Sequence, residues 1–155
     1  MKTNYLLPAK IKILGWVILG VGLIFGGIML YNEYEVNWLT FKITALYSDS
    51  ILGESGFFKS LENSLFDELT CLLIIIGGML VAFSEEKVED EFVNKLRKDS
   101  LVWALIINYV ILIFTVIGVY GVTFFHVLVF NMFTPLLFFI IRFNFLKLKS
   151  RSDEE

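Results

Sequence analysis

The sequence predicts an all-α integral membrane protein, a four-helix bundle that forms one domain over residues 1–155. The first reason is composition: 57% of the residues are hydrophobic and 19% are charged, whereas a water-soluble domain is about 45–50% apolar. The second is pattern, because the apolar residues gather in four blocks. The third is charge, because Lys and Arg concentrate in the two terminal segments and in the loop between the second and third blocks. A four-span topology places these three segments on the same side of the membrane.

The four apolar blocks define the predicted spans. A helix that rises about 1.5 Å per residue needs about 20 residues to cross a hydrocarbon core of about 30 Å. The first block is longer than the core of a signal peptide and has no clear A-x-A-like site, so we expect it to remain as a span. The expected spans are residues 11–30, 65–83, 101–120 and 122–141.

The second block is uninterrupted only over residues 69–83, which is short for a bilayer. Phe58, Leu61 and Leu65 precede it at helical spacing, so we expect the helix to begin upstream of this block and the span to start at about residue 65.

The outer loop, residues 31–64, is rich in aromatic residues. Because Tyr and Trp prefer the membrane–water boundary, "NWLTFKITALYSD" is expected to form an interfacial segment, with a helix as one form of it, followed by a turn at "GESG". The alternative is a plain surface loop.

Positive charge predicts the orientation. Eleven of the thirteen Lys and Arg residues fall in the amino end, the 84–100 segment and the tail 142–155, and only Lys42 and Lys59 fall in the outer loop. Loops rich in Lys and Arg stay in the cytoplasm. We therefore expect a multi-pass protein with both termini cytoplasmic.

The run "FSEEKVEDEFVNKLRKDSLVWA" carries ten charged residues and also a narrow apolar stripe, Val88, Phe92, Val93 and Leu96. This spacing predicts an amphipathic helix over residues 85–100, capped by Ser84 and continuous with the third span. The stripe is expected to dock a partner, with Lys95 and Arg97 at its rim. The alternative is docking on the lipid surface or on the chain's own basic tail.

This run, together with "VFNMFTPLLFFIIRFN", resembles a group of small four-span membrane proteins of Bacteroidota-type bacteria. The resemblance implies a location in the bacterial inner membrane. No activity is established for that group, so the resemblance implies none for this chain.

Small residues predict how the first two spans meet. Gly15, Gly22 and Gly26 share one helical face, and Cys71, Gly78 and Ala82 repeat the same spacing on the second span. Such faces allow helices to approach closely. We expect a hairpin of the two spans, with a dimer seam as the alternative use of the glycines.

Polar residues inside the later spans predict a contact between them. Asn108 in the third span lies at the depth of Asn131 and Thr134 in the fourth, and Arg142 continues that face. We expect a hydrogen bond between the spans. The alternative is a polar cavity that these residues would line.

Asp67 and His126 both lie near the outer face, where a carboxylate and an imidazole can relay protons or hold a metal. One histidine is too few for a typical zinc site, so boundary residues are the alternative. No motif of a membrane enzyme is present in the sequence. We expect no catalytic residue, no cofactor and no metal.

Three functions follow as hypotheses. The first is a non-catalytic interaction or regulatory subunit that acts through the charged helix, with a homo-oligomer, a cytoplasmic protein or a membrane protein as its partner and no nucleic acid. The second is a small oligomeric transporter or channel lined by the polar residues of the spans. The third is an enzyme that acts on a lipid or quinone near the outer face.

Overall fold

The computed structural model of the protein describes residues 6–32, 40–48 and 56–152. Over these residues the chain forms four α-helices and two β-strands: α1 (Ala9–Tyr31), β1 (Thr40–Ser48), β2 (Gly56–Ser64), α2 (Leu65–Ala82), α3 (Glu91–Gly118) and α4 (Val122–Ser152). Each of the four helices is long and apolar enough to cross a membrane. The predicted all-α membrane fold is confirmed, and the chain is a multi-pass membrane protein.

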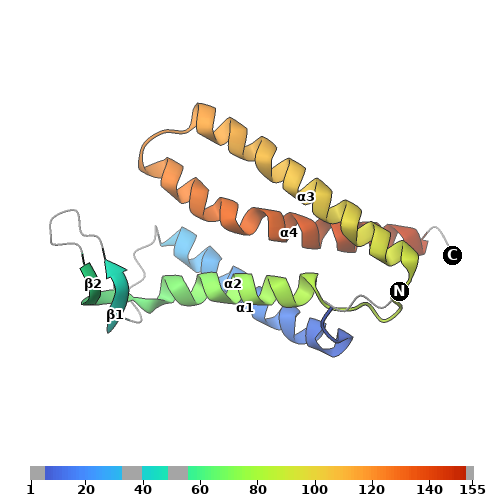
Figure 1. Cartoon of the computed structure of the whole chain (residues 1–155), viewed down its shortest axis with the longest axis horizontal. Coiled ribbons are helices and arrows are strands. Elements are labelled where there is room, and N and C mark those ends of the chain that lie inside the picture. The colour runs from blue at the N-terminus through green and yellow to red at the C-terminus, as the bar shows by residue number, and fades with distance from the viewer. Residues whose placement is uncertain (1–5, 33–39, 49–55, 153–155) are drawn as a thin grey trace.

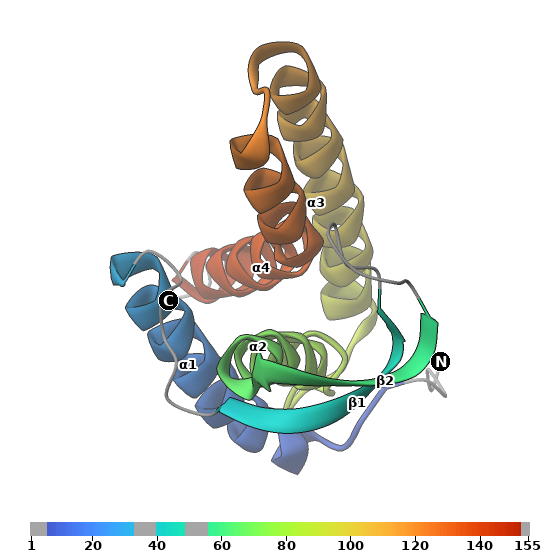
Figure 2. The same ribbon diagram turned by 90° about the vertical axis from the view of Figure 1, so that its left-hand side faces the viewer.

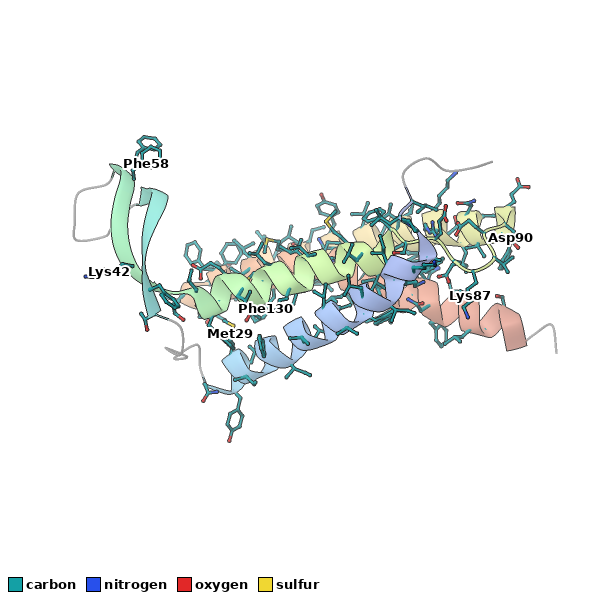
Figure 3. The ribbon with its side chains drawn as sticks, turned by 90° about the horizontal axis from the view of Figure 1, so that it is seen from below. Met29, Lys42, Phe58, Lys87, Asp90 and Phe130 are labelled. Carbon is teal, nitrogen blue, oxygen red and sulfur yellow. The ribbon has the colours of Figure 1, made fainter. Side chains whose placement is uncertain are left out.

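The helices form two antiparallel hairpins. α1 packs against α2, α3 packs against α4, and α2 also contacts α4. The two hairpins lie together at one end and spread apart toward the other (Figures 1 and 2). We call the first the charged end, made by residues 6–12, 83–100 and 142–152. We call the other the hairpin end, because the paired strands β1 and β2 lie there (Figure 1). Figure 3 shows Lys87 and Asp90 at the charged end, opposite Lys42 and Phe58.

Glycine brings the backbones of α1 and α2 together, as the sequence predicted. A Cβ atom at Gly22 would lie 2.9 Å from the backbone nitrogen of Ile74, and one at Gly77 would lie 2.7 Å from the Cα atom of Leu19. Real Cβ atoms do not approach other atoms so closely. The fit therefore requires glycine at both positions.

The predicted face of α2 is correct only in part. Gly77, which the sequence reading left out, faces α1, whereas a Cβ atom at Gly78 would meet the side chain of Leu136 on α4. The adjacent glycines thus serve two neighbours, because successive residues of a helix point about 100° apart.

The outer segment differs most from its prediction. Residues that were expected to form an interfacial helix, or to extend α2 upstream, form the antiparallel pair β1 and β2, in which Thr40 pairs with Ser64 and Ser48 with Gly56. Phe58 and Leu61 therefore lie in a strand, and α2 begins at Leu65. Most of the "GESG" sequence lies outside the described residues.

The charged run is also shorter as a helix than predicted. α3 begins at Glu91, and the Asp90 side chain caps it by accepting a 2.7 Å hydrogen bond from the amide of Val93. Ser84 does not cap it, because its hydroxyl donates to the carbonyl of Leu80 on α2. The prediction that α3 continues unbroken from the charged segment through the span is confirmed from Glu91 onward.

Two helices are much longer than the hydrocarbon core of a bilayer. α3 has 28 residues and α4 has 31, so they extend about 42 and 46 Å, against a hydrocarbon core of about 30 Å. The tail that was predicted from residue 142 onward is the last part of α4. The charged residues of both helices lie at the charged end, so this is where the excess length leaves the hydrocarbon.

Candidate interaction site at the charged end

The centre of the charged end is the carboxylate of Glu86, which lies in the loop between α2 and α3. Its Oε1 atom pairs with the ammonium group of Lys12 on α1. Its Oε2 atom lies 2.8 Å from the ammonium nitrogen of Lys147 on α4. The exposed fractions of these side chains are 10%, 13% and 25% for Glu86, Lys12 and Lys147. One carboxylate thus links two helices to the loop.

A second ion pair fixes the same loop to α3. The guanidinium group of Arg97 donates a 3.1 Å hydrogen bond to Glu89, and the same Glu89 oxygen accepts a 2.9 Å bond from the amide of Glu86. Backbone bonds from Leu7 to Phe83 and from Glu85 to Leu7, both 2.8 Å, attach the loop to the segment before α1. The loop is therefore held on three sides.

Phe143 on α4 forms the floor beneath these charges. The guanidinium carbon of Arg97 lies 5.3 Å from the centre of its ring, and the Lys12 nitrogen lies 5.6 Å from it. Phe143 is buried and stacks on Phe139 at 5.8 Å between ring centres. Attraction between a cation and an aromatic face adds about 0.5–2 kcal/mol for each such contact.

These contacts determine the charge state of Glu86. Burial alone would raise the pKa of its carboxyl, but the hydrogen bonds and charges of Lys12 and Lys147 outweigh that effect and place the pKa below its usual value. Glu86 is therefore ionised in the folded protein at neutral pH, as the pairing with two ammonium groups requires.

The structure separates the residues of the predicted stripe. Val88 lies in the loop and Phe92 in the first turn of α3, and both are exposed, at 72% and 54%. Leu96 packs against the core cluster that holds Phe139 and Phe143. Of the predicted rim charges, Lys95 is exposed, but Arg97 is only 5% exposed because it pairs with Glu89 inside the molecule.

No family model matches this chain, and no curated protein or solved structure is similar to it. The geometry of the chain itself therefore carries the functional argument.

The predicted contact within the membrane is present. Asn131 donates a 3.0 Å hydrogen bond to Asn108, and Asn108 donates one of 3.4 Å in return. Thr134 does not take part, because its hydroxyl donates to the carbonyl of Phe130 in its own helix. The two asparagines satisfy each other, which is the arrangement expected of a link between spans.

Arg142 lies farther toward the charged end on α4. Its guanidinium carbon stands 5.1 Å from the centre of the Trp103 ring on α3. Its Nε atom is buried and has no hydrogen-bond partner among the residues that the structure describes. This side chain thus joins α3 and α4 through the face of an aromatic ring.

Asp67 lies in the first turn of α2, and His126 lies one turn into α4. The ends of the helices that carry them are spread apart at the hairpin end (Figures 1 and 2). His126 is exposed and Asp67 half-buried, so the structure does not bring the two into one pocket. Over the described residues, no three His, Cys, Asp or Glu side chains could together hold a metal ion.

Glu86 was predicted to lie at the start of a helix, so the centre of the site was not among the predicted site residues. Its partners Lys12 and Lys147 are 74 and 61 residues away along the chain, so no local spacing reveals them. One signal was present: the alternative in which the charged run docks on its own basic tail includes Lys147, and the Glu86–Lys147 pair is a contact of that kind.

Proposed function

We propose that the chain is a non-catalytic integral membrane protein that acts as an interaction or regulatory subunit through its charged end. The observation that carries this proposal is the exposure of two large apolar side chains, Val88 and Phe92, among charged neighbours. They lie where α3 extends beyond the hydrocarbon, so lipid tails do not cover them there. Exposed apolar groups rimmed by charge are typical of sites that bind another protein.

The surface favours a transient partner. A stable interface of standard size buries about 800 Å² on each side, which is more than two side chains such as Val88 and Phe92 supply. Glu91 and Lys95 flank Phe92 with opposite charges, and both are exposed. The partner that fits is a protein segment with one or two apolar side chains between charges of both signs, of the kind that regulatory contacts use.

We further propose that the charged end faces the cytoplasm, with the protein in a bacterial inner membrane. The excess of Lys and Arg in the segments of the charged end supports this orientation. The resemblance to the four-span group supports the bacterial location. In this orientation a cytoplasmic protein, or the cytoplasmic part of a membrane protein, reaches Phe92.

A photo-crosslinking residue in place of Val88 tests the function in native membranes. We expect one adduct of defined mass, which disappears when Phe92→Asp is added and weakens with salt when Lys95→Glu is added. The matched control is the crosslinker at Phe145, an exposed residue of α4. The same adduct at both positions, or an adduct with twice the mass of the chain, would contradict a separate partner at this surface.

A further inference from the structure

The charged end also contains an open groove of about 880 Å³. Its walls are the first turns of α1, the loop after α2, the start of α3 and the last turns of α4. α1 and α4 are joined here through Glu86, which pairs with a lysine of each, and through the contact of Lys12 with the ring of Phe143. The groove therefore lies between helices at the boundary of the membrane.

Positive charge is in excess on the α1 and α4 side of the groove. Lys12 and Lys147 line it and share the single carboxylate of Glu86, which leaves one positive charge among these three side chains without a counter-charge. Lys10 lines the same wall and is exposed. Because Lys12 and Lys147 are mostly shielded from water, an anion beside them would be attracted more strongly than at an open surface.

The start of α1 adds to this preference. Pro8 precedes the helix and offers no side-chain acceptor, and the first turn of α1 contains no acidic residue. The amide groups of a helix start favour anions. They act here on the same wall as Lys10 and Lys12.

The wall continues into the membrane as an apolar surface. Ile13 and Trp16 line the groove one turn further along α1, and both are exposed. Tryptophan at this depth is typical of the level of lipid headgroups. A ligand in the groove can thus place a charged group on the lysines and a hydrocarbon chain along α1.

We propose that this groove binds an anionic phospholipid, with the phosphate diester beside Lys10, Lys12 and Lys147 and an acyl chain along Ile13 and Trp16. Basic pockets between membrane helices bind acidic headgroups in this manner. Val88 and Phe92 line the opposite wall of the same groove, together with Glu85 and Asp90. The inference does not rest on the proposed partner, because the headgroup contacts the α1 and α4 wall and the partner contacts the α3 wall. A bound lipid would add a further link between α1 and α4 beside the Lys12–Phe143 contact.

The test compares two lipids on the full chain in a mild detergent. We expect dioleoyl-phosphatidylglycerol to raise the melting temperature above the value with dioleoyl-phosphatidylcholine, and native mass spectrometry to detect one retained phosphatidylglycerol. Lys147→Gln should lower that retention about fivefold, the effect of roughly one lysine near an acidic headgroup. Lys149→Gln removes the same charge from an exposed position that does not line the groove and should change retention little.

Three results would overturn the proposal: equal effects of the two lipids, equal losses in the Lys147 and Lys149 variants, or the same stabilisation by inorganic phosphate alone, which would assign the groove to a soluble anion. If Lys147→Gln fails to fold because Glu86 loses a partner, Lys10→Gln takes its place, since Lys10 is exposed and lines the same wall. Loss of lipid retention in a variant that keeps the Val88 crosslink separates the lipid site from the surface that binds the protein partner.

Discussion

Asn108 on α3 and Asn131 on α4 join their side-chain amides by two hydrogen bonds, of 3.0 and 3.4 Å. Asn108 is buried within the described fold, and each amide supplies one donor and one acceptor to the other. In a hydrocarbon environment an unpaired amide is costly. The pair therefore fixes the register of two long helices that contact each other mainly through apolar side chains.

Replacing Asn108 with leucine should lower the free energy of unfolding by about 0.6–2 kcal/mol, the range for a hydrogen bond between membrane helices. Asn131→Leu should cost a similar amount. The double variant should lose less than the sum of the two, because the first change already removes the interaction. Equilibrium unfolding in mixed detergent micelles measures all three values.

Thr134→Val is the matched control for this pair, because the Thr134 hydroxyl bonds within its own helix. Its effect should add to that of Asn108→Leu. Additive losses for the two asparagines would instead mean that they stabilise the bundle separately, and would favour the cavity that the channel hypothesis needs.

The contact between α1 and α2 predicts a strong effect of a single methyl group. Gly77→Ala should destabilise the protein by about 1–3 kcal/mol, since the new Cβ atom would meet the backbone of Leu19 and force the helices apart. Gly20→Ala is the control, because a Cβ atom there meets nothing within 4 Å. Thermal unfolding in detergent compares them. Equal melting temperatures for the two variants would refute the close packing at Gly77.

The helical spans were predictable because membrane crossing depends on length and hydropathy, which the chain displays directly. The Asn108–Asn131 bond was predictable for a related reason: a tight turn fixes the depth of both residues, so their positions can be counted from residues 119–121. Here local sequence determines the distance between the partners.

The β-hairpin was missed because one signal was given too much weight. The aromatic residues of the outer loop suggested an interfacial helix, but "TFKITALYS" also alternates and contains Thr, Phe, Ile and Tyr, which favour strands. In such a short segment neither the helical period of 3.6 residues nor the strand period of 2 residues is strong. The pairing of β1 with β2 then decides the structure, and that pairing connects segments at some distance along the chain.

The start of α3 was missed for a different reason. Ser84 and Asp90 are both good caps, so local preference does not choose between them. The choice is made by Glu86 and Glu89, whose partners Lys12, Lys147 and Arg97 hold residues 84–90 in a loop before α3. Lys12 on α1 and Lys147 on α4 reach the loop across 74 and 61 residues of sequence, a separation that sequence periodicity does not describe.

The proposed orientation predicts the accessibility of two lysines at opposite ends of the molecule (Figure 3). In a Cys71→Ser background, a cysteine in place of Lys42 should react with a membrane-impermeant thiol reagent in intact cells. A cysteine in place of Lys87 should react only after lysis, because the basic segments remain in the cytoplasm. The reverse pattern of labelling would invert the topology and place the groove and Phe92 outside.

Acidification should loosen the charged end through Glu86. The pKa of Glu86 in the folded protein lies below its usual value of 4.5. The ionised carboxylate therefore stabilises the folded state more than the protonated carboxyl does. Its contribution is complete above about pH 4.5 and is lost as the pH falls through the lower folded pKa. The melting temperatures of the parent and Glu86→Gln should differ by a constant amount from pH 7 to about 4.5 and converge below it.

Glu85→Gln, a change at the exposed neighbour, separates this effect from general repulsion at low pH. A difference between parent and Glu86→Gln that persists unchanged to pH 3 would show that the carboxylate does not hold Lys12 and Lys147 together by its charge.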